Sequence, residues 1–545
     1  MAPTLLEVDR LQTSFGTGER VFRAVDDVSF RLEQDKTLVL LGESGCGKSV
    51  TALSIMRLLP TAARITGGRV LLRGTNLFEM PEYAMRTVRG GRIAMIFQEP
   101  QSSLNPVLSV GLQIGETLRQ HKGLKGRAQR TRILELLDAV GIPEPERRID
   151  EYPHQFSGGM KQRIMIAIAL AAEPELLIAD EPTTALDVTI QAQVLRLLKD
   201  LQARTGMGIL FITHDLGVAY QMGDDVAVMY GGKIVENRAR VPFFQKPEHP
   251  YSQKLFDALP TKEKRDQERR AGWVAPDGKS LLKVEELKVH FPIRRGVFKH
   301  TVGYVRAVDG VSLEIREGQT VAVVGESGSG KTTLGKGILQ LLRPTDGSVI
   351  FNGHDLLAMD ARELRRQRTD IQFVFQDPYS SMNPRMMIID IIQEGMIAQG
   401  VGGDRTQRLR RVDELLQQVG LEPQHKYRYP HEFSGGQRQR ICIARALAVE
   451  PRLIICDEPT SALDVSVQAQ ILQLLGDLQR QLGVAYLFIT HNISVVEYLA
   501  HYVAVMYKGK IVEQGEVDDV LYSPRHDYTR QLLSAVPRVG AGISN

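Results

Sequence analysis

Short apolar runs with almost no polar interruption recur along the chain, and each ends in small or polar residues. TLVLL leads into the glycine-rich GESGCGKS, LLIADEP covers Leu176 to Pro182, and GILFITH covers Gly208 to His214. Runs of this length without a polar face are typical of strands in a parallel sheet covered on both sides. The pattern therefore predicts an α/β fold, with helices on both faces of a parallel sheet.

The pattern occurs twice. FSGG begins at Phe156 and again at Phe433, 277 residues later, and the glycine-rich segment at Gly42 recurs at Gly325, 283 residues later. This period is too long for a solenoid, whose repeats span about 20–50 residues. We therefore expect two copies of one domain joined by a charged linker. The expected boundaries are 1–260, 261–280 and 281–545.

The linker contains TKEKRDQERRAG, from Thr261 to Gly272. Eight of these twelve residues are charged, and no apolar face is evident. Such composition is typical of a solvated tether.

Composition narrows the classes of protein. The 545 residues include 68 basic and 64 acidic ones, so the net charge of +4 argues against a dedicated nucleic-acid binder. No secretory leader and no run of eighteen apolar residues is evident, so we expect a cytosolic protein that acts at a membrane only through a partner. The spacing of Cys46, Cys442 and Cys456 argues against a zinc or iron–sulfur site.

Both glycine-rich segments match GxxxxGK[ST] between a strand and a helix, the pattern of a phosphate-binding loop. Its backbone N–H groups converge on phosphate oxygens, and the helix N-terminus favours negative charge. Lys48 and Lys331 are expected to reach the β- and γ-phosphates, and Ser49 and Thr332 to place a hydroxyl on Mg²⁺. The predicted loop residues are Gly42, Glu43, Ser44, Gly45, Cys46, Gly47, Lys48, Ser49 and Val50, and Gly325, Glu326, Ser327, Gly328, Ser329, Gly330, Lys331, Thr332 and Thr333.

An acidic pair follows a buried strand in each copy. Asp180 and Asp457 are the expected magnesium-side carboxylates. Glu181 and Glu458, one residue further on, are placed to polarise an attacking water. Such a pair alone often indicates only a solvated strand end, but its recurrence with the loop favours the catalytic interpretation.

Polar residues also follow the other apolar strands. His214 and His491 follow the acidic pairs at the same distance in both copies, which favours a γ-phosphate contact over a helix-capping role. Gln98 and Gln376 are the last residues of IAMIFQ and FVFQ, directly after apolar strands, and could orient water or Mg²⁺.

FSGGMKQR and FSGGQRQR begin helices with a serine cap, and such an N-terminus can meet an anion. The residues expected to contact nucleotide here are Ser157, Gly158, Gly159, Ser434, Gly435, Gly436 and Gln437.

In each copy these motifs follow one order: the phosphate loop, the glutamine, the SGG signature, the acidic pair, TALD or SALD, and the histidine. This is the order found in ATP-binding-cassette ATPases, and both copies resemble that family over nearly their whole length. The resemblance implies two P-loop NTPase domains, each a RecA-like α/β core with an antiparallel β subdomain and a helical signature subdomain. It implies hydrolysis of ATP with Mg²⁺. It also implies an internal pseudo-dimer, in which each ATP lies between one copy's loop and the other's signature.

By this resemblance, the first ATP site would combine Ser434 and Gly436 of the second copy with six residues of the first copy: Lys48, Ser49, Gln98, Asp180, Glu181 and His214. The second site would combine Lys331, Thr332, Gln376, Asp457, Glu458 and His491 with Ser157 and Gly159. Asp187 and Asp464 match the family's D-loop, which communicates between the two ATP sites. Phe15 and Phe291 match the aromatic residue that stacks on adenine, and the nearby alternatives for that role are Phe22, Phe298 and Tyr304. Met160 replaces the usual signature glutamine. Because both sites keep lysine, glutamate and histidine, we expect both to be competent.

EHPYSQKLFDALP and RHDYTRQLLSAVP, which follow the two cassettes, resemble the C-terminal motif of oligopeptide and dipeptide importer ATPases. Fusion of two such cassettes is similar to YejF-type ATPases, which serve uptake of peptides and microcin C-like antibiotics, and also to glutathione-importer ATPases. The resemblance implies a peripheral subunit on the cytoplasmic face of a bacterial inner membrane. Its partners would be two transmembrane permease subunits, expected to differ, and an extracytoplasmic peptide-binding protein.

The sequence fits two other classes of ATPase less well. A ribosome-associated translation factor has a long charged helical linker, whereas about twenty residues separate the copies here. A DNA-repair ATPase would need zinc-binding cysteines that this sequence lacks.

Overall fold

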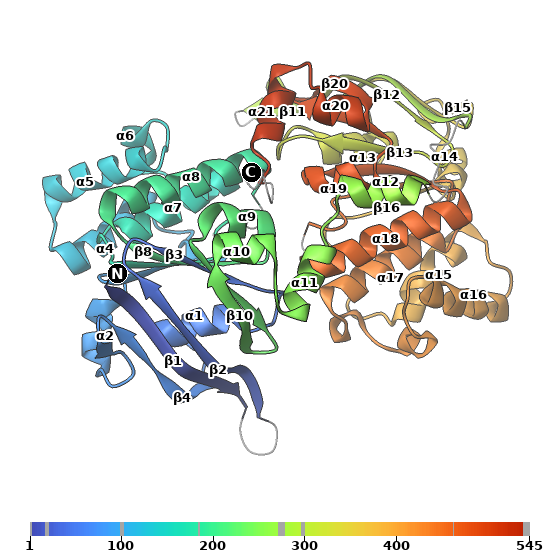
Figure 1. Cartoon of the computed structure of the whole chain (residues 1–545). Helices are drawn as coiled ribbons and strands as arrows, with labels where there is room; N and C mark the ends of the chain where they lie inside the picture. Colours follow the sequence, from blue (N-terminus) through green and yellow to red (C-terminus); the bar gives the residue numbers. More distant parts are fainter. Residues whose placement is uncertain are drawn as a thin grey trace. The chain divides into compact units, whose positions relative to one another are not determined.

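The computed structural model describes residues 3–16, 21–98, 103–183, 186–270, 278–295, 300–461 and 463–537. They form two compact units, made mainly of residues 1–257 and 258–536. Each unit contains one six-stranded and one four-stranded sheet, with the same strand order in both units (Figure 1). The predicted duplication of an α/β domain is confirmed.

The six-stranded sheets have the orders β10-β9-β3-β8-β7-β6 and β20-β19-β13-β18-β17-β16. Their inner pairs are parallel as predicted, while β10 and β20 run antiparallel to their neighbours. The first sheet consists of β3 (Thr37–Leu41), β6 (Ile93–Ile96), β7 (Leu176–Asp180), β8 (Gly208–Thr213), β9 (Asp225–Tyr230) and β10 (Lys233–Ala239). The second consists of β13 (Thr320–Val324), β16 (Ile371–Val374), β17 (Leu453–Asp457), β18 (Ala485–Thr490), β19 (Tyr502–Tyr507) and β20 (Lys510–Glu516).

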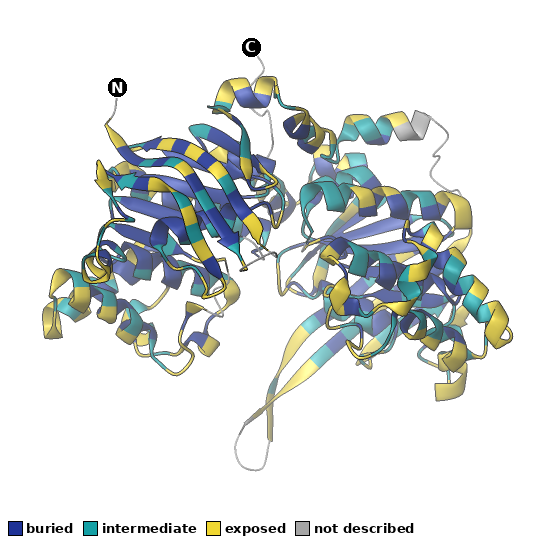
Figure 2. Cartoon of the chain, turned by 90° about the horizontal axis from the view of Figure 1, so that it is seen from below, coloured by how far each residue is buried: buried dark blue, intermediate teal, exposed yellow. Residues whose placement is uncertain are grey.

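The four-stranded sheets are antiparallel and correspond to the expected β subdomains. Buried and exposed residues alternate along many of their strands, as is usual for sheets with one face in the core (Figure 2). Their strands are β1 (Thr4–Phe15), β2 (Phe22–Glu33), β4 (Ala63–Leu72) and β5 (Thr75–Asn76), and β11 (Ser280–Arg295), β12 (His300–Arg316), β14 (Asp346–Phe351) and β15 (His354–Asp355).

Helices between β6 and β7, and between β16 and β17, form the helical segments that precede and include the signature. In the first unit these are α4 (Val110–Lys122), α5 (Gly126–Ala139), α6 (Pro145–Arg148) and α7 (Gly158–Leu170). In the second they are α15 (Ile388–Gln399), α16 (Arg405–Gln418) and α17 (Gly435–Leu447).

Most of the other described α-helices follow strands of the sheets, while two follow a preceding helix and one lies in the linker. Those of the first unit are α1 (Lys48–Met56), α2 (Glu82–Val88), α8 (Val188–Thr205), α9 (Leu216–Met222), α10 (Arg240–Gln245) and α11 (Pro250–Asp257). Those of the second are α12 (Lys262–Arg270), α13 (Lys331–Ile338), α14 (Ala361–Gln367), α18 (Val465–Leu482), α19 (Ile493–Leu499), α20 (Val517–Tyr522) and α21 (Asp527–Ser534). None of the helices in the described ranges is long and apolar enough to span a bilayer.

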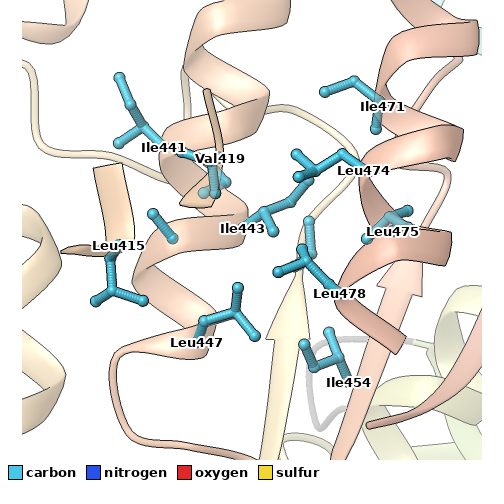
Figure 3. Packing of buried hydrophobic residues seen from close by; sticks show 14 of the residues in the cluster. Leu415, Val419, Ile441, Ile443, Leu447, Ile454, Ile471, Leu474, Leu475 and Leu478 are labelled. Carbon is cyan, nitrogen blue, oxygen red and sulfur yellow. The ribbon is translucent and has the colours of Figure 1, made fainter. Parts of the chain in front are cut away.

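Signature helix α17 is held by an apolar cluster shared with α16, α18 and β17 (Figure 3). Ile441 and Leu447 of α17 pack with Leu415 of α16, Ile454 of β17 and Leu475 of α18, and all five are at most 2% exposed. Burying an aliphatic side chain of this size contributes roughly 1.5–3 kcal/mol. The signature serine therefore begins a helix with a well-fixed axis.

The expected solvated tether is wrong for the first part of the linker. Its residues form α12, which packs against α19. Arg265 is only 1% exposed, donating to the Glu497 carbonyl at 3.1 Å and to Asp518 Oδ1 at 2.7 Å. Charge content misled the prediction because an arginine can bury its stem when the guanidinium finds fixed acceptors.

Replacing Arg265 with alanine is expected to lower the free energy of unfolding of the second unit by about 2–4 kcal/mol, because a buried cation and its stem packing are lost. Urea unfolding measures this change. Arg306→Ala removes the ion pair of an exposed arginine with Asp309 and is the control, expected to change stability by under about 1 kcal/mol. Equal effects of the two substitutions would contradict a structural role for α12.

Candidate functional site

The predicted polar residues gather at the carboxyl ends of neighbouring parallel strands. In the first unit the phosphate loop with Ser49 follows β3, Asp180 ends β7 with Glu181 next to it, and His214 follows β8. Gln98 follows β6 at the same edge. Ligands of open parallel sheets bind at this edge, because the loops that leave the strands meet there.

The first cluster joins the phosphate loop to the acidic pair. Ser49 Oγ donates to Asp180 Oδ1 at 3.0 Å, and Thr332 Oγ1 donates to Asp457 Oδ1 at 3.0 Å. Each unit thus pairs a hydroxyl with a carboxylate beside the loop. Mg²⁺ prefers such hard oxygen donors, so these residues fit the ion that the sequence predicts.

The second cluster holds the glutamate. Gln98 Nε2 donates to Glu181 Oε2 at 3.1 Å, and His214 Nδ1 lies 3.2 Å from Glu181 Oε1. The second unit repeats the arrangement with Gln376, Glu458 and His491, at 3.0 and 3.1 Å. Both glutamates have left-handed backbone, with φ of 45° and 46°. A non-glycine residue in this region is strained, and such strain is concentrated at functional sites.

The two carboxylates of each pair lie in different electrostatic surroundings. Burial raises the pKa of Asp180 to about 6 and also raises that of Asp457. Burial is the largest single influence on Glu458 and by itself would raise its pKa. The hydrogen bond and charge of His491, together with the charge of Lys331, outweigh burial and leave that pKa below its usual value. The aspartates therefore favour a proton or a cation, whereas Glu458 stays ionised.

This predicts a pH-dependent effect of Asp180→Asn. Because the fold raises the pKa of Asp180, its contribution to the free energy of unfolding declines as pH rises from about 4 to about 6. Asparagine can still accept from Ser49 but carries no charge, so without nucleotide or Mg²⁺ the variant should equal wild type at pH 4 and exceed it by roughly 2–3 kcal/mol at pH 8. Chemical unfolding at both pH values tests this, and a variant less stable than wild type at pH 8 contradicts it.

The loop lysines are buried inside the loops. Lys48 is 4% exposed, and its Nζ donates to the carbonyls of Gly42 at 2.7 Å and Glu43 at 2.8 Å. Lys331 makes the matching bonds, and burial lowers its pKa. Because neutral carbonyls are weaker partners than phosphate oxygens, an ammonium held in this way is ready to bind an anion.

The signature serines cap helices as predicted. Ser157 accepts from the Met160 amide at 3.4 Å, and Ser434 accepts from the Gln437 amide at 3.3 Å. The side-chain oxygen of Gln437 in turn accepts from the Ser434 amide at 3.1 Å, which completes a capping box. The methionine at 160 has no amide oxygen with which to do this, so the first signature helix lacks the box.

The adenine-stacking residues stay a prediction. Phe15 and Phe291 lie in β1 and β11 of the antiparallel sheets. Their rivals Phe22 and Tyr304 are 64% and 60% exposed, more than the 39% of Phe291, and Phe298 lies outside the described residues.

Sequence reasoning missed one contact of the phosphate loop. The hydroxyl of Tyr528, in the second C-terminal motif, accepts from the Glu326 amide at 3.0 Å. The motif itself was visible in the sequence, but no local pattern relates it to a loop about 200 residues earlier.

Comparisons with known proteins show the family of the chain. The ABC transporter family model matches residues 25–184 and 308–461, and the model of the oligopeptide/dipeptide transporter C-terminal region matches residues 235–280 and 512–544. The chain is 48% identical to glutathione import ATP-binding protein GsiA of Salmonella typhimurium strain LT2, over 98% of this chain and 89% of the relative. It is 47% identical to GsiA of Escherichia coli strain K12, over 98% and 90%.

Among solved structures, dimeric MJ0796 in a post-hydrolysis state bound to ADP and Pi is 30% identical over 44% of this chain and 99% of that chain, with a TM-score of 0.40. Sequence motifs, strand topology, site geometry and family models lead to one assignment. The chain belongs to the ABC transporter ATPases and carries two cassettes, each followed by an oligopeptide/dipeptide transporter C-terminal region.

Proposed function

We propose that this chain is the ATP-hydrolysing motor subunit of a bacterial importer for peptides or peptide-like compounds. The observation that carries the proposal is the oligopeptide/dipeptide transporter C-terminal region after both cassettes. Relatives named for glutathione import, similar over nearly the whole chain, support it. They make glutathione the first cargo to test. Di- and oligopeptides and the microcin C-like cargo of YejF-type ATPases are the alternatives.

We propose that Mg²⁺ is held by Ser49, Gln98 and Asp180 in one site and by Thr332, Gln376 and Asp457 in the other. The close hydroxyl–carboxylate pairs and the raised aspartate pKa values support this assignment. Bound Mg²⁺ offsets the negative charge that develops on the β- and γ-phosphates.

The chain's own residues position the reactants. Lys48 exchanges its bonds with loop carbonyls for bonds with phosphate oxygens, and the loop amides bind the remaining oxygens. Glu181, held by Gln98 and His214, accepts a proton from the water that attacks the γ-phosphate. Positioning and electrostatics provide most of the rate enhancement in phosphoryl transfer.

The signatures complete the sites in this proposal. Ser434 and Gly436 act with the first phosphate loop, and Ser157 and Gly159 act with the second. ATP binding then closes the cassettes on each other, while hydrolysis and product release reopen them. The motor works at the cytoplasmic face of the inner membrane with two permease subunits, which we expect to differ because the cassettes differ. An extracytoplasmic binding protein delivers the cargo.

The first experiment is isolation of the chain from its native membranes, with identification of the proteins that co-purify. Two multi-span permeases and an extracytoplasmic binding protein are the expected result. Ribosomal proteins without a permease would overturn the proposal. The isolated complex in proteoliposomes, with the binding protein and ATP, is then tested for uptake of radiolabelled glutathione, a dipeptide and a microcin C-like peptide. ATP-dependent uptake of none of these would refute the peptide-like cargo.

A further inference from the structure

The C-terminal motifs contain two tyrosines that are buried although they follow the cassette cores. Tyr251, in α11, is 9% exposed, and Tyr528, in α21, is 7% exposed. Each ring lies against another tyrosine at the end of a core strand: Tyr230 of β9 at a centroid distance of 4.2 Å, and Tyr507 of β19 at 4.1 Å. Such aromatic pairs stabilise the packing beyond the apolar area that they bury.

The backbone before each tyrosine is fixed by a carboxylate. In the second unit Glu513 accepts from the amides of Arg525 at 2.7 Å and His526 at 3.0 Å. His526 Nδ1 accepts in turn from the Tyr528 amide at 3.1 Å, which caps α21. The first unit repeats these bonds with Glu236, Glu248, His249 and Tyr251. Bonds from a carboxylate of the preceding strand, together with the histidine cap inside the motif, thus fix the direction of the tyrosine ring.

Within the tripeptide that ends in this tyrosine, the two motifs differ only at the middle residue, where helix geometry tolerates the change. Pro250 and Asp527 are the first residues of α11 and α21. Proline suits this position because its missing N–H has no intrahelical partner, and aspartate suits it because the helix N-terminus favours negative charge. His-Pro-Tyr and His-Asp-Tyr therefore present the tyrosine in the same way.

The tyrosine meets the phosphate loop. Tyr528 Oη accepts from the amide of Glu326, the second loop residue, at 3.0 Å. The first unit differs here: the hydroxyl of Tyr251 is buried without a hydrogen-bond partner among the described residues, although the charge of Glu43, the equivalent loop residue, adds to burial in raising the pKa of Tyr251. The turn after β19 also contacts the loop, since the Gly509 amide donates to the Ser329 carbonyl at 2.9 Å. The second phosphate loop, the turn between β19 and β20, and helix α21 are therefore packed together.

We propose that Tyr528 is a positioning residue that holds the second phosphate loop in the conformation that binds ATP, so that the second C-terminal region forms part of its own cassette's nucleotide site. The inference rests on the proposed function, because it assigns this loop to ATP. A loop amide bound to a fixed hydroxyl cannot rotate freely, and its neighbours keep the directions they need to converge on phosphate. The motif then acts on ATP affinity without touching the nucleotide.

The test compares tyrosine-to-phenylalanine variants of the full chain. Tyr528→Phe keeps the stacked ring and removes only the acceptor of the Glu326 amide. The matched control is Tyr486→Phe, because Tyr486 is fully buried in β18 and its hydroxyl donates to the Leu475 carbonyl at 3.1 Å. Each variant is titrated with a fluorescent ATP analogue and Mg²⁺, and its melting temperature and steady-state kinetics are measured.

Tyr528→Phe is expected to raise the Kd for the analogue and the KM for ATP roughly tenfold, with kcat restored at saturating ATP. Tyr486→Phe is expected to lower the melting temperature and leave Kd unchanged. An unchanged Kd in Tyr528→Phe, or an equal rise in Tyr486→Phe, would overturn the inference. Failure of the wild-type chain to bind the analogue would instead overturn the proposed function.

Discussion

Replacing both Glu181 and Glu458 with glutamine is expected to lower the rate of ATP hydrolysis by roughly two to three orders of magnitude while ATP still binds. The amide cannot accept a proton from the attacking water. It also places an N–H₂ group where, in the wild-type chain, a carboxylate oxygen of Glu181 contacts Gln98 or His214. The loop, the lysine and the aspartate remain, so the variant should stay in an ATP-bound, closed state.

Single-turnover phosphate release and retention of radiolabelled ATP test this prediction. Glu135→Gln, which removes an exposed carboxylate on α5, is the matched control and should hydrolyse ATP at the wild-type rate. Rapid phosphate release by the double variant would exclude the two glutamates as bases. The single variants test the expectation of two competent sites, since near wild-type hydrolysis by Glu181→Gln would make the sites unequal.

Replacing Gly330 with alanine is expected to weaken ATP binding at the second phosphate loop at least roughly a hundredfold. Gly330 has a φ of 108°, and a Cβ there would lie 2.0 Å from the Ala307 carbonyl oxygen. The loop must therefore move away from β12, which displaces Lys331 directly after it. The Kd for ATP at that site, measured in the full chain, tests the prediction.

Gly353→Ala is the matched control. Gly353 also has a positive φ, of 82°, but a Cβ there meets no atom within 4 Å. It should therefore lose some stability from backbone strain and bind ATP normally. If the two substitutions weaken ATP binding equally, the close contact with Ala307 is not what shapes the loop.

The duplicated α/β fold and most of the candidate site could be predicted because their signals are local. The fully buried strands TLVLL and LLIAD read as apolar runs, and the phosphate loop is a single continuous segment. The acidic pair and the histidine follow such strands directly. Parallel strands bring these ends to one edge of the sheet, so the sequence order of the motifs was enough to predict that they meet.

The charged segment that forms α12 shows a feature that local sequence signals could not predict. Its composition predicts solvation, because the sequence does not reveal that Glu497 and Asp518 lie where Arg265 can reach them. The partners are more than 200 residues away, and only the packing of α12 on α19 creates the contact.

By itself, the sequence determined that there are two cassettes, which strands are buried and which residues could carry phosphate chemistry, since composition and short-range spacing encode these properties. Tertiary structure decided the rest. Gln98 and His214 hold both oxygens of Glu181, the backbone of that glutamate is left-handed, and Tyr528 reaches the Glu326 amide. Each of these depends on chain segments far apart in sequence, whose distances and directions are set only when the sheet and its covering helices have packed.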